Sequence, residues 1–107
     1  MKKEYGKKLL KGRFYWHQDG SKKRFHPTLI YKKNDDKNLY YIVCFTSSKG
    51  RGRRKLFENI DPTSNEECYV LNNPRCAKRK SFGSQLPSFR VCNKRDKITI
   101  KRIQKKK

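Results

Sequence analysis

The chain has 107 residues, which is enough for one small domain. Thirty lysines and arginines stand against nine aspartates and glutamates, so the formal net charge is +21, and 33% of the residues are hydrophobic. A core this thin excludes a deep pocket for a large organic molecule, and we expect no cofactor. The longest mainly apolar run, residues 39–45, is too short to cross a bilayer, and the basic first residues lack the apolar stretch of a secretory signal. We therefore expect a cytoplasmic protein.

The apolar residues follow the period of short β-strands separated by turns. Runs of β-branched and aromatic residues predict strands over 13–17, 28–33, 38–46, 55–60, 67–72, 88–92 and 97–103. The Asn and Asp residues between the second and third runs predict a hairpin. No stretch of ten residues keeps a helical apolar period. The sequence thus predicts a mainly β fold, a strongly bent sheet or small barrel of six or seven strands with little helix.

The domain organisation is simple. We expect a single β-barrel domain over residues 12–103. A basic N-terminal segment precedes it over residues 1–11, and residues 104–107 are expected to be a disordered basic tail.

The excess positive charge predicts a polyanionic partner. An anionic membrane surface would need a basic amphipathic helix, which the pattern does not show, so we favour RNA and expect no membrane contact. The basic residues gather between the apolar runs, which predicts cationic loops around one fold. The residues that we expect to contact RNA phosphates are Lys22, Lys23, Arg51, Arg53, Arg54, Arg75, Lys78 and Arg79.

The four cysteines are expected to be reduced and structural. In a reducing compartment they do not predict a disulfide framework. Their spacing contains no C-x-x-C pair, which argues against zinc, so we expect no metal. Cys44 and Cys92 fall inside predicted strands, where cysteine behaves as a small hydrophobic residue.

Two segments carry the residues best suited to phosphate chemistry. One is a basic loop, residues 20–26, which leads through Pro27 into an apolar run, and the other is an apolar run that ends in residues 46–49, Thr-Ser-Ser-Lys. Hydroxyl and ammonium groups donate hydrogen bonds to phosphate oxygens, and a cation stabilises the charge that develops during reaction. His26 adds a group that transfers protons near neutral pH. A Ser/Thr cluster after a strand is also a common turn, so both interpretations stay open here.

This order of segments resembles the PemK/MazF-like toxins of bacterial toxin–antitoxin systems. Residues 24–30, RFHPTLI, are similar to the basic loop, proline and strand of that family, and residues 42–47, IVCFTS, to its strand ending in a catalytic threonine. Residues 46–49 are similar to the Thr-Ser-x-Lys of the ToxN-like branch, which an RNA antitoxin neutralises. Residues 69–75, YVLNNPR, resemble a later strand followed by Pro-Arg. The resemblance covers about residues 12–103.

Three features depart from the family pattern. His26 stands where the family usually has arginine, so either His26 or Arg24 takes that role. Val70 and Asn72 stand where some members have a charged pair. We also expect no counterpart of the C-terminal helix of the family, which leaves a homodimer possible but open.

The resemblance implies an SH3-like barrel and a metal-independent endoribonuclease that leaves 2′,3′-cyclic phosphate and 5′-OH ends on single-stranded RNA. In this sequence Thr46 and Ser47 would orient the phosphate, Lys49 and Arg24 would stabilise its charge, and His26 would carry the proton. It also implies an antitoxin partner, which is either an acidic protein or a structured RNA.

Two other functions fit the same composition. The first is a non-catalytic RNA-binding barrel, in which bases stack on Tyr15, Trp16, Phe25 and Tyr31. The second is an inhibitor that binds the acidic face of a nucleic-acid enzyme.

Overall fold

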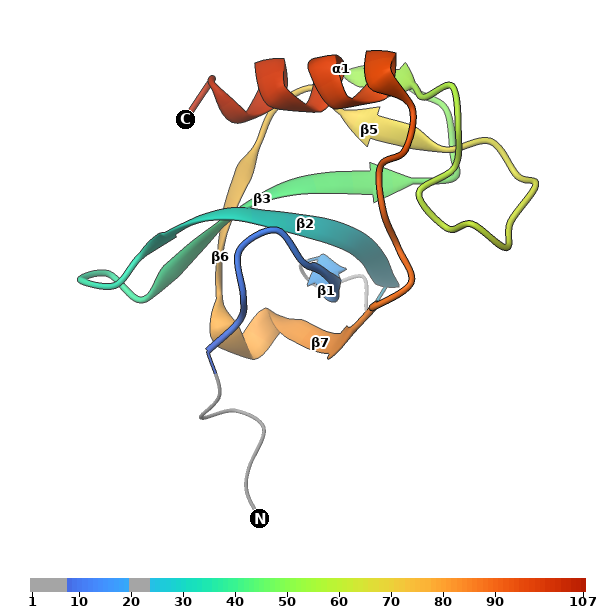
Figure 1. Cartoon of the computed structure of the whole chain (residues 1–107). Coiled ribbons are helices and arrows are strands. Elements are labelled where there is room, and N and C mark those ends of the chain that lie inside the picture. Colours follow the sequence, from blue (N-terminus) through green and yellow to red (C-terminus); the bar gives the residue numbers. More distant parts are fainter. Residues whose placement is uncertain (1–7, 20–23) are drawn as a thin grey trace.

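The computed structural model describes residues 8–19 and 24–107. In this part of the chain, seven antiparallel strands and one α-helix form a mainly β molecule (Figure 1), which confirms the predicted fold class. The strands are β1 (Phe14–Asp19), β2 (Arg24–Asn34), β3 (Leu39–Thr46), β4 (Arg53–Lys55), β5 (Tyr69–Leu71), β6 (Arg75–Lys78) and β7 (Phe82–Gln85). A short 3-10 helix, η3 (Arg79–Ser81), joins β6 to β7, and helix α1 (Lys94–Gln104) ends the fold.

The long strands β2 and β3 form the centre of the sheet. The hydrogen-bonded order is β4-β5-β3-β2-β1-β7, and β6 pairs with the other half of the β3 edge that β5 occupies. Strands β6 and β7 therefore lie at opposite ends of the path β6-β3-β2-β1-β7, and η3 connects them directly along the chain (Figure 1). A bent sheet of this connectivity is typical of small β domains, and full closure into a barrel stays a prediction.

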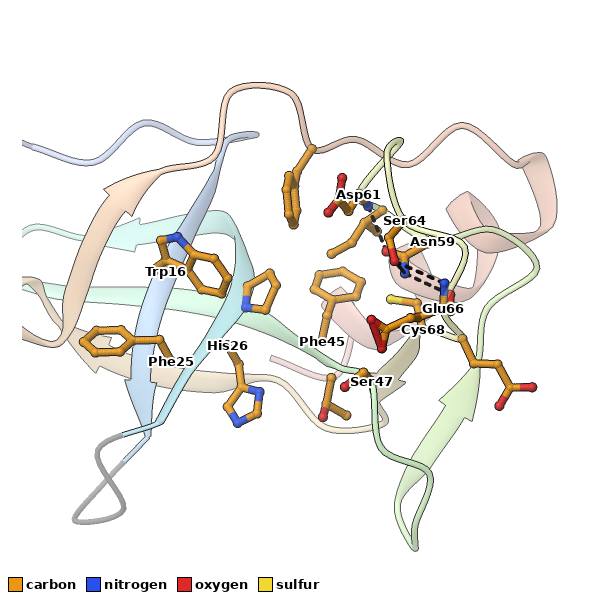
Figure 2. Close-up of a pocket in the computed structure, with 15 residues that line it drawn as sticks. Trp16, Phe25, His26, Phe45, Ser47, Asn59, Asp61, Ser64, Glu66 and Cys68 are labelled. Carbon is orange, nitrogen blue, oxygen red and sulfur yellow. Dashed lines mark hydrogen bonds between the residues drawn. The ribbon is translucent and has the colours of Figure 1, made fainter.

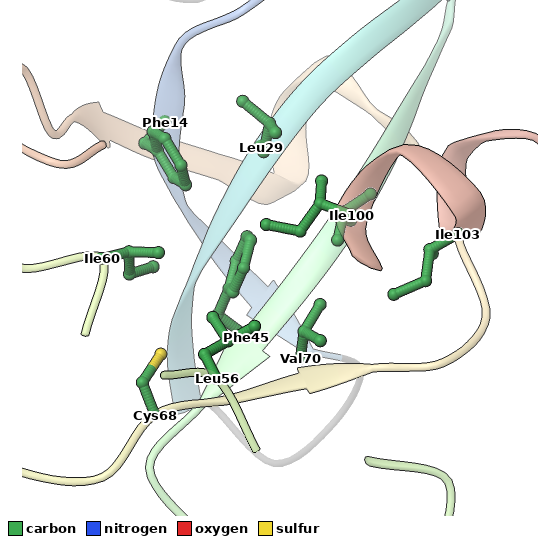
Figure 3. Packing of buried hydrophobic residues seen from close by; sticks show 10 residues of the cluster. Phe14, Leu29, Phe45, Leu56, Ile60, Cys68, Val70, Ile100 and Ile103 are labelled. Carbon is green, nitrogen blue, oxygen red and sulfur yellow. The ribbon is translucent and has the colours of Figure 1, made fainter. Parts of the chain in front are cut away.

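Each face of the central strands has its own hydrophobic core, because successive side chains of a strand point to opposite faces. Phe14, Leu29 and Phe45 pack on one face with Ile100 and Ile103 from α1 (Figure 3). The opposite face is covered by a second cluster, whose members are Leu9, Tyr15, Ile30, Tyr40, Ile42, Cys44 and Phe82. The ends of β1, β2 and β3 thus present two separate surfaces, one on each side of the sheet.

The predicted strand over 97–103 is wrong, because these residues belong to α1. Asn93 begins the helix by accepting hydrogen bonds from the backbone amides of the second and third residues after it. Asp96, Ile100 and Ile103 then recur at helical spacing and form its buried face. The β-branched residues of this stretch imitate a strand, and the expectation that the C-terminal helix is missing is also wrong.

The two ends of the described chain are in contact with the fold. Leu9 is buried, and its amide donates a hydrogen bond to the Tyr40 hydroxyl (3.2 Å). Lys106 Nζ donates to the carbonyl oxygen of Asn72 (2.8 Å), just beyond α1. Residues 1–7 of the predicted N-terminal segment lie outside the described residues.

The predicted strand over 88–92 is wrong, the one over 55–60 overlaps β4 only at Lys55, and β6 and β7 were not predicted. Residues 56–60 and 88–92 form loops, whereas β6 and β7 are strands of mostly exposed residues with no alternating apolar pattern. Cys92 is accordingly exposed, contrary to its predicted place in an apolar strand, while Cys44 is buried in β3 as predicted.

Candidate functional site

Strands β1 and β2 place two histidines opposite one another. The antiparallel register pairs His17 with His26, and cross-strand partners of this kind have Cβ atoms about 4.5–5.5 Å apart. His17 is buried and its ring packs against Phe82, with the ring centroids 5.0 Å apart. His26 is half-buried and lies near the start of β2 (Figure 2). One imidazole is therefore packed into the fold, and its neighbour is open to solvent.

Thr46 ends the adjacent strand on the same face. Thr28 of β2 pairs with Cys44 of β3. His26 lies two residues before Thr28, and Thr46 lies two residues after Cys44, so the antiparallel strands place His26 and Thr46 on the same face. The Thr46 hydroxyl oxygen accepts a hydrogen bond from the Ser48 amide (3.3 Å), so these residues do form a local turn. The hydroxyl proton of Thr46 still serves as a donor, so the turn and the phosphate site are compatible.

These strand ends enclose a small cavity of about 60 Å³. Two imidazoles, a threonine hydroxyl and two guanidinium groups line it, and they belong to His17, His26, Thr46, Arg53 and Arg75. The lining residues of this cavity include no aspartate or glutamate among the described residues. It is too small for a whole nucleotide, since ligand pockets usually measure about 300–1,000 Å³. Its size and charge suit one small anionic group.

Arg53 is held in place by the loop between β3 and β4. Its Nη1 atom donates a hydrogen bond to the carbonyl oxygen of Ser48 (2.7 Å). A guanidinium carries five N–H donors, so further donors remain for an anion. Gly52, at φ +72°, supplies the left-handed backbone that turns the chain into β4 just before Arg53.

A larger cavity of about 330 Å³ lies on the other face of the same strand ends (Figure 2). Its strand side carries aromatic residues, Trp16 from β1 and Phe25 from β2. Its other side is the loop of residues 59–68 that precedes β5. Three residues line both cavities, namely His26, Phe45 and Thr46. The two cavities are thus neighbours.

The loop of residues 59–68 is held by hydrogen bonds of its own side chains. Asn59 Nδ2 donates to Ser64 Oγ (3.3 Å) and to the Glu66 carbonyl oxygen (3.0 Å), while its Oδ1 atom accepts from the Asp61 amide (2.9 Å). Asp61 Oδ1 accepts from both the amide and the hydroxyl of Thr63 (3.0 and 2.8 Å). This wall of the cavity is therefore preorganised.

The five predicted catalytic residues do not all meet. Thr46, Ser47 and His26 line the cavities, whereas Lys49 and Arg24 line neither cavity in the described structure. Arg24 is exposed at the start of β2. Lys49 lies in the exposed segment after β3.

The positive charge of Lys49 instead acts on the carboxylate of Glu67. The pKa of this carboxyl is lowered mainly by the hydrogen bond from Lys55 and then by that from Tyr69, with the charge of Lys49 as the smallest contribution. The Lys55–Glu67 ion pair, 2.8 Å long, is mostly exposed and adds little to stability.

The predicted RNA-contacting residues divide into two groups. Arg53 and Arg75 line the small cavity, so they lie beside the predicted catalytic residues. The others that the structure describes line neither cavity; they are Arg51, Arg54, Lys78 and Arg79. Lys22 and Lys23 lie outside the described residues.

Sequence reasoning missed His17 as a site residue. It stands in a predicted strand and looks like a core residue, which in part it is. The signal that would have found it is symmetry, because His17 and His26 are placed to pair if residues 18–25 form the connection between two antiparallel strands.

Neither a metal cluster nor a membrane span is found in residues 8–19 and 24–107. No three side chains of His, Cys, Asp or Glu gather there as metal ligands would, and no helix there is long and apolar enough to cross a bilayer. The sequence matches no protein-family model and no curated protein.

Proposed function

We propose that the protein is a toxin-like endoribonuclease that cleaves single-stranded RNA at the small cavity. The observation that carries the proposal is the cross-strand pair of His17 and His26, beside Thr46 and the guanidinium groups of Arg53 and Arg75, around one space that fits a phosphate. The resemblance to PemK/MazF-like toxins supports the same activity.

The reaction needs a base, an acid and a stabiliser of negative charge. The RNA 2′-oxygen attacks the adjacent phosphorus while its proton passes to a base, and the 5′-oxygen leaves with a proton from an acid. These steps give a 2′,3′-cyclic phosphate and a 5′-OH end. The imidazoles of His17 and His26 lie close enough together to divide the two proton transfers between them. No step of this scheme requires a metal.

The remaining residues would bind the phosphate itself. Arg53 and Arg75 bring positive charge to the non-bridging oxygens, where charge increases in the transition state. The Thr46 hydroxyl donates a hydrogen bond to one of these non-bridging oxygens. In this scheme His26, and not Arg24, is the residue of the proline loop that takes part in the chemistry, because His26 lines the cavity.

The proposal includes a partner of opposite charge. A site with two guanidinium groups on a chain of net charge +21 suits a polyanion that blocks it, either an acidic protein or a structured RNA. Such a partner would act as the antitoxin by covering the small cavity.

The test is cleavage of a single-stranded RNA by the purified protein, with analysis of the product ends. We expect cyclic phosphate and 5′-OH ends, and no cleavage where one 2′-OH is replaced by hydrogen. His26→Ala and Thr46→Ala should lose cleavage while keeping most RNA affinity, and Arg24→Ala should keep both. RNA that is bound but left intact by the wild-type protein would instead favour the non-catalytic RNA-binding barrel.

A further inference from the structure

The wall of the larger cavity differs in charge from the rest of this basic chain. Four of the nine acidic residues fall within residues 58–67, and Asp61, Glu66 and Glu67 line the cavity. A phosphate bound here would face carboxylates and be repelled. The volume of about 330 Å³ nevertheless lies within the range of ligand pockets, about 300–1,000 Å³. The cavity therefore disfavours a second phosphate and suits a group without negative charge.

The strand side of this cavity offers flat apolar surfaces. Trp16 is half-buried, and Phe25 is 52% exposed although it is a large apolar residue in a strand. In the register of β1 and β2, Trp16 pairs with Pro27, and Phe25, two residues before Pro27, lies on the same face as Pro27. A nucleobase that stacks on aromatic side chains binds about 5- to 150-fold more tightly for that contact. The strand side thus suits a planar base.

The loop side offers mainly hydrogen-bond acceptors. The amide group of Asn59 is already used within the loop, and both carboxylate oxygens of Glu67 accept hydrogen bonds from Lys55 and Tyr69. In contrast, Asp61 uses only Oδ1, and within the described residues its Oδ2 atom accepts no hydrogen bond. A carboxylate only accepts, so this wall prefers a base edge that carries N–H donors.

We propose that this cavity binds a guanine base of the RNA next to the cleaved phosphate, with the Asp61 carboxylate accepting from the base. Guanine presents two N–H donor groups side by side, whereas adenine and cytosine place an acceptor beside their amino group, and uracil flanks one N–H with two carbonyls. The position of the base rests on the function proposed above, because His26, Phe45 and Thr46 line both cavities and would link the base to its phosphate.

The experiment uses a signal that is independent of cleavage. Trp16 is the single tryptophan of the chain and lines the cavity, so a base stacked there should quench its fluorescence. The ligands are 2′-O-methyl trinucleotides that differ only in the central base, which cannot be cleaved through the 2′-oxygen. We expect the guanine ligand to bind about tenfold or more tightly than the uracil ligand, with adenine and cytosine also weaker than guanine.

Paired variants separate hydrogen bonding from stacking. Asp61→Asn should remove most of the guanine preference, whereas Asp36→Asn, the same charge change in an exposed hairpin, should keep it. Phe25→Ala should weaken all four ligands by a similar factor of about 5 to 150, whereas Phe57→Ala, which removes another exposed ring outside the cavity, should not.

The two proposals fail in different ways. Equal binding of the four ligands, tighter binding of another base, or a preference that survives Asp61→Asn would overturn the guanine site, even if RNA is cleaved. Guanine-selective binding without cleavage of any RNA would support the guanine site and overturn only the nuclease.

Discussion

The Asp96 carboxylate in α1 accepts a hydrogen bond from the backbone amide of Phe57 through Oδ1 (2.9 Å), and its Oδ2 atom accepts from the next amide, that of Glu58 (3.0 Å). Asp96 is 2% exposed. The helix therefore holds the start of the loop that forms one wall of the larger cavity. An element far from the strand ends in sequence thus shapes the candidate site.

Replacing Asp96 should loosen this connection. The substitution Asp96→Asn would keep one acceptor oxygen but turn an amide N–H₂ group towards a backbone N–H, so we expect a loss of about 1.5–3 kcal/mol in the free energy of unfolding. Urea unfolding measures the loss, with the exposed Asp36→Asn as the control. A stability equal to that of the control variant would contradict the anchoring role.

The sequence predicted the central sheet well, and its edges and the helix poorly. The continuous apolar runs in β2 and β3 follow from burial on both faces, which leaves a local signal in the sequence. In α1, only Asp96, Ile100 and Ile103 are buried against the fold, and the exposed Ile98 between them hides the helical period. Strands β6 and β7 are held by pairing with β3 and β1, and such tertiary contacts leave no apolar pattern in the sequence.

The candidate site was also predicted only in part, because some of its residues are brought together by tertiary contacts that leave no pattern in the sequence. Thr46 and His26 belong to segments whose order along the chain already suggested a phosphate site. Arg53 and Arg75 looked like any other members of basic clusters, and only the pairing of β5 with both β3 and β4 and of β6 with β3 shows that they face one cavity.

Arg53 and Arg54 are neighbours on β4 and allow a matched test of the site. Arg53 lines the small cavity and Arg54 lines neither cavity, within the described residues. Arg53→Ala should lower the rate of RNA cleavage about 10²- to 10³-fold, because it removes a preorganised stabiliser of charge. Arg54→Ala should instead weaken binding modestly and reduce the salt slope of log affinity by about 0.7. Equal effects of the two variants on the cleavage rate would contradict the assignment.

The histidine pair should shape the pH dependence of cleavage. If one imidazole acts as base and the other as acid, kcat/KM should rise and then fall with pH, since the pair is active only when one imidazole is neutral and the other is protonated. His26→Ala should remove one limb of this profile as well as lowering the rate. His17→Phe keeps a ring against Phe82 and tests the second limb without opening the core. A profile that keeps both limbs in both variants would exclude the pair as acid and base.

Burial should protect two of the four thiols. Cys76 and Cys92 are exposed, whereas Cys44 and Cys68 are buried, and burial raises the pKa of the Cys68 thiol. We expect native protein at pH 8 to react quickly with a thiol reagent at two sites and slowly at two others until it unfolds. Peptide mapping identifies them. Rapid labelling of Cys68 in the native state would contradict its place in the core.

The same raised pKa gives a pH dependence of stability. The unfolded thiol ionises above its ordinary pKa of about 8.5, while burial raises the pKa of the Cys68 thiol, so that it ionises at a higher pH in the folded state. The folded state then binds more protons, so this group makes stability fall as the pH rises above that value. Cys68→Ala should be less stable at neutral pH but should lose less stability between pH 8 and 10 than the wild type. Urea unfolding at several pH values measures both.

Two glycines allow steric crowding and backbone conformation to be tested separately. A Cβ atom on Gly83 would lie 3.3 Å from the Trp16 Cβ and 3.8 Å from Phe25 Cε1, so Gly83→Ala must displace the aromatic side of the larger cavity. A Cβ atom on Gly52 would meet nothing within 4 Å, but φ there is +72°. We therefore expect Gly52→Ala to lose about 1–2 kcal/mol of stability without affecting the Trp16 fluorescence signal or base binding.

Gly83→Ala should show the opposite pattern. Its backbone is open to any residue, so we expect a smaller loss of stability together with a shifted Trp16 emission and weaker quenching by the 2′-O-methyl ligands. Thermal unfolding and fluorescence titration of the two variants measure both quantities on the same samples. If Gly83→Ala leaves both the Trp16 emission and the ligand quenching unchanged, the added methyl group is accommodated without displacing the Trp16 ring, and the expected effect of Gly83 on the base-binding surface is wrong.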